Sequence, residues 1–317
     1  MLKILPAFFG RILYYETELH IFMAKKITKA VIPAAGLGTR MLPIARVVPK
    51  EMLPIVDRPA ISYLVEEAAD SGATDILIIT GRNKGAIEDY FDFSPEYENK
   101  LHASGKDSQI EYLRSIAKRA NVFFIRQRET MGLGHAIKCA RSFTADDLFF
   151  VLYGDDIIFS QTPVCKQLAN AYEKYGLASC GVKEVPRELV KKYCSLKVSP
   201  LGDDIYKVFS MVEKPKTDAE IYSCFSILGR VLLTGDVYDI LDNTPLGAGG
   251  ELQLTDAMKV IAESLPTGGM TAVDFEGKRY DMGSKLGFLY ANVEQAVKNP
   301  ELGEEFKAYL REFVKTL

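Results

Sequence analysis

Apolar and polar residues alternate along the first half of the chain in a pattern that predicts strands separated by helices. Short apolar runs, typical of buried strands, occur at residues 30–32, 76–80, 122–125 and 148–153. The stretches between them carry apolar residues at helical spacing, over residues 60–70, 84–91 and 135–143. This order is typical of a parallel sheet covered by helices and joined by right-handed crossovers.

The second half is less regular. Strands are expected at residues 177–182, 206–212 and 226–228, and helices near 234–242, 255–264, 284–298 and 301–315. No linker rich in Pro, Gly or Ser separates the halves, so we predict one α/β domain over residues 26–317. Its halves are placed at 26–160 and 161–290, with C-terminal helices at 284–317. The predicted fold is a Rossmann-like mixed, mostly parallel sheet flanked by helices, with a smaller second lobe.

Two segments fall outside this pattern. Residues 92–121 are polar and irregular with a helical end, and we interpret them as an insertion placed to cover a site. Residues 1–22 begin with an apolar run too short to span a bilayer and without a signal-peptide cleavage site. Met23, followed by Ala-Lys-Lys, is a more natural start. We therefore expect residues 1–25 to be a disordered extension from an upstream start codon, with a docked extension as the alternative.

Composition excludes some classes of partner. The chain has 39 basic and 42 acidic side chains and a net charge of −3, so no bulk field favours nucleic acid or an anionic membrane. Its 48% hydrophobic residues are ample for a buried core. The five cysteines include no CxxC pair, and there are only three histidines. This pattern favours reduced cysteines in a cytoplasmic protein.

The sequence PAAGLGTRMLP at 33–43 follows a predicted strand and has the chemistry of a phosphate-binding loop. Gly36 and Gly38 let backbone amides approach a phosphate, and Arg40 adds a permanent cation. The loop is not a Walker A motif, because no Gly-Lys-Ser/Thr follows. Nor is it a dinucleotide fingerprint, because Met41 stands at the third glycine. On this motif alone, an ordinary strand-to-helix turn remains the alternative.

A second motif, PKEMLPIVDRPAI at 49–61, places Lys50 and Glu51 between two prolines that restrict the backbone. Lysine binds phosphate as a point charge. The alternative is a solvated Lys-Glu pair on a loop. The two motifs together favour a site for a polyphosphate.

Taken in order, these motifs and five further segments resemble the bacterial UTP:glucose-1-phosphate uridylyltransferase family, within the sugar-nucleotidyltransferase superfamily. The further segments are RQRETMGLGHAI at 126–137, YGDD at 153–156, MVEKP at 211–215, GAGGELQLTDAM at 247–258 and FEGKRYDMGSKLGF at 275–288. The resemblance covers the chain beyond about residue 25. Relatives that transfer thymidylate resemble the chain less, because their first loop is richer in glycine and lacks PKEMLPI.

The resemblance implies transfer of UMP from UTP to glucose 1-phosphate, with Mg²⁺ as cofactor, in a cytoplasmic homodimer or homotetramer. It implies that the first half binds the nucleotide and that the smaller lobe binds the sugar. The catalytic residues it implies are Arg40, Lys50 and Lys214. The nucleotide-binding residues are Ala34, Ala35, Gly36, Gly38, Glu51, Gln127 and Gly132. The sugar-phosphate-binding residues are Gly181, Glu213 and Lys214, and the metal-binding residues are Asp155 and Asp281.

The residue chemistry is compatible with these roles. The Gln127 amide offers a donor and an acceptor suited to a uracil edge. Asp155 follows a predicted parallel strand, at the sheet edge where ligands of α/β folds bind, and its oxygens suit Mg²⁺. Alternatives remain: Asp281 as a turn cap before Gly283, and Glu213 with Lys214 as a surface turn. For Asp156 we leave open a weak metal contact or a helix cap.

The sugar half departs from the family pattern. Tyr193-Cys194-Ser195 stands where relatives usually have Tyr-Gly and a small apolar residue, and residues 223–226, Ser-Cys-Phe-Ser, replace a stretch that usually contains asparagine. Arg46 stands where a lysine is usual. Two other functions therefore stay open: transfer to another hexose 1-phosphate or from dTTP, and a non-catalytic regulatory paralogue.

Overall fold

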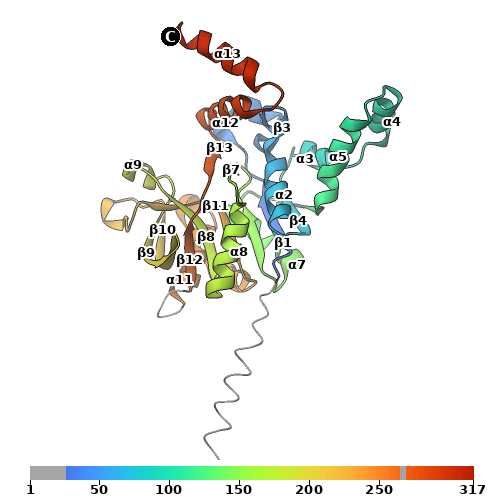
Figure 1. The fold of residues 1–317 in the computed structure, drawn as a ribbon. Helices are drawn as coiled ribbons and strands as arrows, with labels where there is room; N and C mark the ends of the chain where they lie inside the picture. The colour runs from blue at the N-terminus through green and yellow to red at the C-terminus, as the bar shows by residue number, and fades with distance from the viewer. Residues whose placement is uncertain (1–25, 265–268) are drawn as a thin grey trace, which may run out of the picture.

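The structure is a computed structural model that describes residues 26–264 and 269–317, and the expectation for residues 1–25 lies outside the described residues. Within the described part, the centre is a nine-stranded sheet of order β5-β4-β1-β6-β11-β8-β12-β10-β9 (Figure 1). The strands are β1 (Lys29–Pro33), β4 (Asp75–Thr80), β5 (Asn121–Arg126), β6 (Phe149–Leu152), β8 (Ala178–Glu184), β9 (Cys194–Gly202), β10 (Ile205–Glu213), β11 (Phe225–Leu233) and β12 (Met270–Asp274).

The sheet is mixed and mostly parallel, as predicted. Strand β1 pairs in parallel with β4 and β6, β4 with β5, and β12 with β8. Strand β11 is antiparallel to β6 and β8, and β10 is antiparallel to β12 and β9. Only β10 and β11 therefore run against the other strands of this described sheet.

Shorter elements surround the described sheet. Two ribbons pair β2 (Pro54–Ile55) with β3 (Arg58–Pro59) and β7 (Asp156–Phe159) with β13 (Lys278–Asp281). The 3-10 turns are η1 (Thr39–Met41), η2 (Ile44–Arg46), η3 (Lys50–Met52), η4 (Asp218–Glu220) and η5 (Ala248–Gly250). The helices are α2 (Ala60–Asp70), α3 (Gly85–Phe91), α4 (Pro95–Ala103), α5 (Asp107–Arg119), α6 (Leu133–Lys138), α7 (Arg141–Thr144), α8 (Val164–Tyr175), α9 (Arg187–Val190), α10 (Val237–Asn243), α11 (Leu254–Glu263), α12 (Lys285–Lys298) and α13 (Gly303–Val314).

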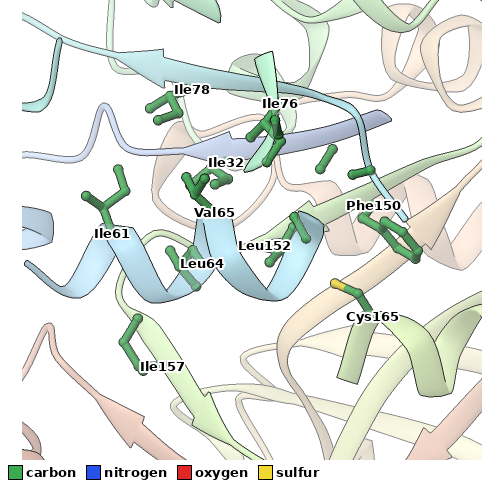
Figure 2. Close-up of a cluster of buried hydrophobic side chains, with 14 of the residues drawn as sticks. Ile32, Ile61, Leu64, Val65, Ile76, Ile78, Phe150, Leu152, Ile157 and Cys165 are labelled. Carbon is green, nitrogen blue, oxygen red and sulfur yellow. The ribbon is translucent and has the colours of Figure 1, made fainter. Parts of the chain in front are cut away.

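Apolar side chains cover both faces of the sheet, because successive residues of a strand point to opposite faces. On one face, Ile32 and Ile78 join a cluster that includes Ile61 and Leu64 of α2, as Figure 2 shows. On the other face, Val31 and its neighbours pack with residues of α6, α10 and α11. Strands buried on both faces read as the continuous apolar runs seen in the first half of the sequence.

The sequence predicted the first half better than the second. Helix α2 has the predicted bounds, and the four predicted strands agree with β1, β4, β5 and β6 to within two residues at either end. The sequence did not predict β9, which carries Lys197 and other polar residues at an edge of the sheet, or β12, a short buried strand inside the sheet. The helical end predicted for residues 92–121 agrees with α5, but the part interpreted as irregular was wrong, because it contains the helix α4. Both helices project from the body of the molecule (Figure 1).

A buried ion pair joins α2 to the middle of the sheet. The Arg230 side chain on β11 is fully buried, and its Nε and Nη2 donate to the two carboxylate oxygens of Glu67 on α2 at 2.8 and 2.7 Å. Nη1 donates to the carbonyl oxygen of Asp156 at 2.9 Å. Glu67 also accepts from the backbone N–H of Cys165 at 3.2 Å. One arginine thus fixes β11, α2 and the start of β7 against one another.

We predict that Glu67→Leu and Arg230→Met each lower the free energy of unfolding by about 3–5 kcal/mol, because each leaves one buried charge unpaired. The double variant should lose less than either single variant, because no buried charge then lacks a partner. Chemical denaturation measures all three, with the exposed Glu304→Gln as a control that stays within about 0.5 kcal/mol. Additive losses in the double variant would contradict the pairing.

Candidate active site

A cavity of about 430 Å³ lies beyond the carboxyl ends of β1, β5 and β6, and we call it the inner cavity. Ligands of open α/β sheets bind at this edge. Eight of the residues predicted to bind the nucleotide, its phosphates or the metal line this cavity: Ala35, Gly36, Gly38, Lys50, Glu51, Gln127, Gly132 and Asp155. Ala34, also predicted to bind the nucleotide, is instead almost fully buried among the apolar residues beneath the loop.

The loop after β1 arches over Lys50. The backbone N–H of Ala34 still bonds to the sheet, at the Ile79 carbonyl, and the chain then turns away. Gly38 has φ of 66°, a left-handed conformation that glycine adopts without strain. A Cβ on Gly36 would lie 3.9 Å from the Lys50 Nζ, so the loop backbone runs directly past the ammonium group. We call residues 35–40 the phosphate loop.

Two cations and two carboxylates meet beside the inner cavity. Lys50 and Asp155 line it, and Arg40 and Asp281 do not. Lys50 pairs with Asp155, and the Arg40 guanidinium lies 3.5 Å from Asp155 and 3.0 Å from Asp281. Burial raises the pKa of Asp155, but the charges of Lys50 and Arg40 outweigh it and bring the pKa below its ordinary value. Burial likewise lowers the pKa of Lys50, while Asp155 and Glu51 more than reverse this. Both groups are therefore ionised at neutral pH.

The β7–β13 ribbon brings Asp281 beside Asp155. Asp281 is paired in register with Asp156, and the Met282 N–H donates to the Asp155 carbonyl oxygen at 2.8 Å. A Cβ built on Gly283 would lie 2.5 Å from an Asp155 oxygen, 2.7 Å from Arg40 and 3.0 Å from an Asp281 oxygen. Gly283 thus lets both carboxylates and Arg40 lie closer to its backbone than a side chain there would allow.

Asp156 is neither a helix cap nor part of the cavity lining. It begins strand β7 and is buried, and its side chain pairs with Arg279 at 2.5 Å. No role was predicted for Arg279, although it lies in the FEGKRYDMGSKLGF segment, two residues before Asp281. That segment is the sequence feature that could have indicated a role for it.

Glu51 has a buried oxygen without a partner. One carboxylate oxygen, Oε2, accepts from Lys84 at 2.5 Å, while Oε1 is buried without a hydrogen bond among the described residues. Burial raises the pKa of Glu51, partly offset by Lys84 and Lys50. An unsatisfied buried acceptor is costly, and this one belongs to a residue that lines the inner cavity. It is therefore suited to accept a hydroxyl from a bound ligand.

Gln127 and Gly132 are held together. The Gln127 amide nitrogen lies 3.3 Å from the Gly132 carbonyl oxygen and 2.9 Å from His135 Nδ1. Gly132 has φ of 98°, and a Cβ there would lie 2.7 Å from the Leu252 carbonyl oxygen. This close approach brings Glu251 into the cavity lining. Glu251 was not predicted, although it lies in the quoted GAGGELQLTDAM segment.

The three residues predicted to bind the sugar phosphate do not line the inner cavity. Strand β10 ends at Glu213, and Lys214 turns away with φ of 46°, in agreement with the predicted strand end. Lys214 is half exposed and 3.7 Å from Glu213. Gly181 lies within β8, where a Cβ would approach Phe275 at 3.1 Å. Burial raises the pKa of Tyr153, which lines the inner cavity, well above its ordinary value.

The departures from the family pattern bond to one another. Ser195 Oγ donates to the Ser223 carbonyl at 2.8 Å and accepts from the Ser223 N–H at 3.1 Å. Ser226 Oγ donates to the Cys194 carbonyl at 2.6 Å. Cys194 Sγ accepts from the Ile227 N–H at 3.2 Å, and burial raises its pKa to about 12. These changed residues thus fasten the start of β9 to the start of β11.

Comparison with known proteins agrees with this geometry. A family model described as nucleotidyl transferase matches residues 29–296. The chain is 47% identical to UTP–glucose-1-phosphate uridylyltransferase YngB of Bacillus subtilis, over 92% of this chain and 97% of that protein. It is 46% identical to a UTP–glucose-1-phosphate uridylyltransferase of Staphylococcus haemolyticus, over 91% and 99%.

Solved structures are also similar. A UDP-glucose pyrophosphorylase complexed with UDP-glucose matches with a TM-score of 0.78 at 38% identity, covering 86% of this chain and all of that one. A UTP-bound enzyme of the same name from Acinetobacter baumannii matches with a TM-score of 0.82 at 36% identity, covering 90% and 99%. The chain therefore belongs to the nucleotidyl transferase family, in the group of UTP–glucose-1-phosphate uridylyltransferases.

Proposed function

We propose that the protein transfers UMP from UTP to glucose 1-phosphate, giving UDP-glucose and pyrophosphate. The observation that carries this proposal is the convergence of Arg40 and Asp281 on Lys50 and Asp155, which line the inner cavity. Two cations and two carboxylates beside a glycine-containing loop suit a metal-bound polyphosphate. The relatives with UDP-glucose and with UTP bound support the choice of substrates.

The nucleotide fits the lining of the inner cavity. Gln127 has the amide groups to recognise a uracil edge, and its bond to the Gly132 carbonyl orients it beforehand. The partnerless oxygen of Glu51 would accept a ribose hydroxyl. Gly36 and Gly38 leave the loop amides free to approach the phosphates. Ala35 lines the same cavity and contacts the base or ribose.

In the proposed reaction, a phosphate oxygen of glucose 1-phosphate attacks the α-phosphorus of UTP. The new P–O bond forms as the bond between the α-phosphorus and the bridging oxygen breaks, and pyrophosphate leaves with that electron pair. The attacking phosphate is already ionised, so no protein nucleophile or general base is required. Catalysis then rests on positioning and on charge stabilisation by Arg40, Lys50 and Lys214.

We propose that Asp155 and Asp281 together hold a divalent cation. Both carboxylates converge beside Gly283, and Arg40 already joins them as a cation. We propose Mg²⁺, because it uses one or two carboxylates and completes its shell with phosphate oxygens and water. When bound, the ion neutralises charge on the phosphates. Arg40, whose side chain is 62% exposed, is free to turn from the carboxylates to the phosphates.

Glu213 and Lys214 are proposed to bind the sugar hydroxyls and the phosphate, with Gly181 beneath them. Burial raises the pKa of Glu213, with Lys214 among the groups that oppose the shift. The serine and cysteine bonds between β9 and β11 favour a second candidate, a different hexose 1-phosphate as acceptor. A non-catalytic paralogue is disfavoured, because Arg40, Lys50, Asp155, Lys214 and Asp281 are all present.

We further propose a cytoplasmic homodimer or homotetramer. Helix α12 exposes Leu289 and Tyr290, and α13 exposes Tyr309 and Phe313, which stack on each other. Figure 1 shows α13 beyond α12, away from the sheet. Such an apolar surface is typical of an interface between subunits. In the described part of the chain, no helix has the length and apolar character needed to cross a membrane.

The substrate proposal predicts that purified protein with Mg²⁺ releases pyrophosphate fastest from UTP and glucose 1-phosphate. The assay crosses UTP and dTTP against the 1-phosphates of glucose, galactose and N-acetylglucosamine, and chelation of the metal should abolish release. Preference for another sugar would support the second candidate. UTP binding without turnover of any pair would contradict the proposed reaction.

Lys214→Ala should lower kcat by about 10²-fold or more, because it removes a charge that stabilises the transition state. Lys216→Ala is the matched control: it is an exposed lysine two residues away and should change kcat by less than about threefold. Steady-state rates with saturating substrates measure both. An effect below about threefold for Lys214→Ala would defeat its catalytic role.

The oligomer proposal predicts a solution mass that is two or four times the 35.3 kDa of one chain. Leu289→Glu combined with Tyr309→Glu should give the monomer mass, because two charges would then be buried at the interface. Tyr97→Glu, at an equally exposed tyrosine on α4, should leave the mass unchanged. Light scattering after size-exclusion chromatography measures each mass, and a monomeric wild type would refute the interface.

A further inference from the structure

A second cavity, of about 680 Å³, adjoins the inner cavity along the phosphate loop, and we call it the outer cavity. Its apolar lining includes Leu37, Leu42 and Met131, each of which is exposed to a substantial degree. The remaining lining is rich in cationic side chains, contributed by Arg46, Arg82, Lys84 and Arg128. None of these groups has a role in the reaction proposed above.

Three chain segments bring the arginines of the outer cavity together. Strands β4 and β5 pair in parallel with Thr80 opposite Arg126, so Arg82 and Arg128 each lie two residues beyond that register pair. Arg46 ends the turn η2, on the far side of the phosphate loop. The tertiary structure therefore brings these arginines together, and no run of basic residues in the sequence predicts it.

The positive charge of the outer cavity is not neutralised. Within the described residues, Arg46, Arg82 and Arg128 form no ion pair, and Glu129 is the one acidic side chain in the lining. Lys84 is already paired with Glu51. Beside the inner cavity, by contrast, Asp155 and Asp281 pair with Lys50 and Arg40. Free guanidinium groups bind phosphate through paired N–H bonds, so this cavity favours a polyanion.

The two cavities share one wall. Ala35, Leu37, Thr39, Gln127 and Thr130 line both of them. A buried ion pair also connects them, because Glu51 lines the inner cavity and Lys84 the outer one. A ligand on the outer side therefore contacts the same loop that would hold UTP on the inner side. By linkage, any effect that occupation of one cavity has on the affinity of the other is reciprocal and equal in factor.

We propose that the outer cavity is a second anion site that binds a polyphosphate and acts on the nucleotide site through the phosphate loop. The polyphosphate is either pyrophosphate alone or the phosphate tail of a nucleotide. In the second case the nucleoside lies against Leu37, Leu42 and Met131. Binding at this site requires no turnover. A binding measurement therefore tests this proposal independently of the proposed reaction.

The test is calorimetric titration of the full chain with inorganic pyrophosphate and, in parallel, with UTP. Four proteins are compared: wild type, Arg82→Gln combined with Arg128→Gln, Arg126→Gln and Lys50→Ala. Arg126→Gln is the matched control, because Arg126 is exposed on the same strand end but lines neither cavity. Arg82, Arg126 and Arg128 are exposed, so we expect their replacement to leave the thermal unfolding temperature unchanged. Measuring that temperature verifies that these variants fold.

Wild type should bind pyrophosphate at two sites per chain. The double variant should lose at least about tenfold in affinity at one of them, while Arg126→Gln retains both and Lys50→Ala weakens only the other. Tighter binding of UTP than of pyrophosphate at the outer site assigns the nucleotide, and equal binding assigns the polyphosphate alone. A single site in wild type that Lys50→Ala removes, or unchanged binding by the double variant, would overturn the proposal.

Discussion

The arrangement of the candidate site depends on a chain of buried charges that begins at Arg230. This arginine pairs with Glu67 of α2 and holds the carbonyl of Asp156, and the Asp156 side chain in turn pairs with Arg279. Arg279 lies on β13, two residues before Asp281. Asp155 and Asp281, which come from distant parts of the chain, are thereby fixed on either side of one glycine. Buried ion pairs contribute little net stability, but removing one partner is costly.

These buried ion pairs hold the framework around the site in place. The polar groups within the site therefore need not all satisfy one another. Lys50 and Arg40 pair with the carboxylates, and one oxygen of Glu51 keeps no partner among the described residues. Each of these is a contact that a nucleotide, a phosphate or a metal ion can replace or complete. The phosphate loop lies between this cluster and the free arginines of the outer cavity, so charge acts on it from both sides.

In the sugar region, hydrogen bonds rather than ion pairs join the segments. Cys194, Ser195, Ser223 and Ser226 depart from the usual family pattern, yet they bond to one another across β9 and β11. Changes that complement one another keep buried polar groups satisfied. They therefore preserve the position of this region while altering the chemistry near Glu213, which is where discrimination among hexoses is proposed to occur.

The sequence by itself determined the strands of the first half, the helix α2 and eight of the residues that line the inner cavity. Buried parallel strands read as apolar runs, and glycines and prolines mark the loops between them. The motifs also identified Lys50, Gln127 and Asp155, which lie together in the structure. The sequence did not reveal the polar edge strand β9, the helix α4, or the roles of Glu251, Lys84 and Arg279. Only the tertiary structure decided these, because their partners lie far along the chain: Lys84 meets Glu51, and Arg279 meets Asp156, through packing that no local pattern records.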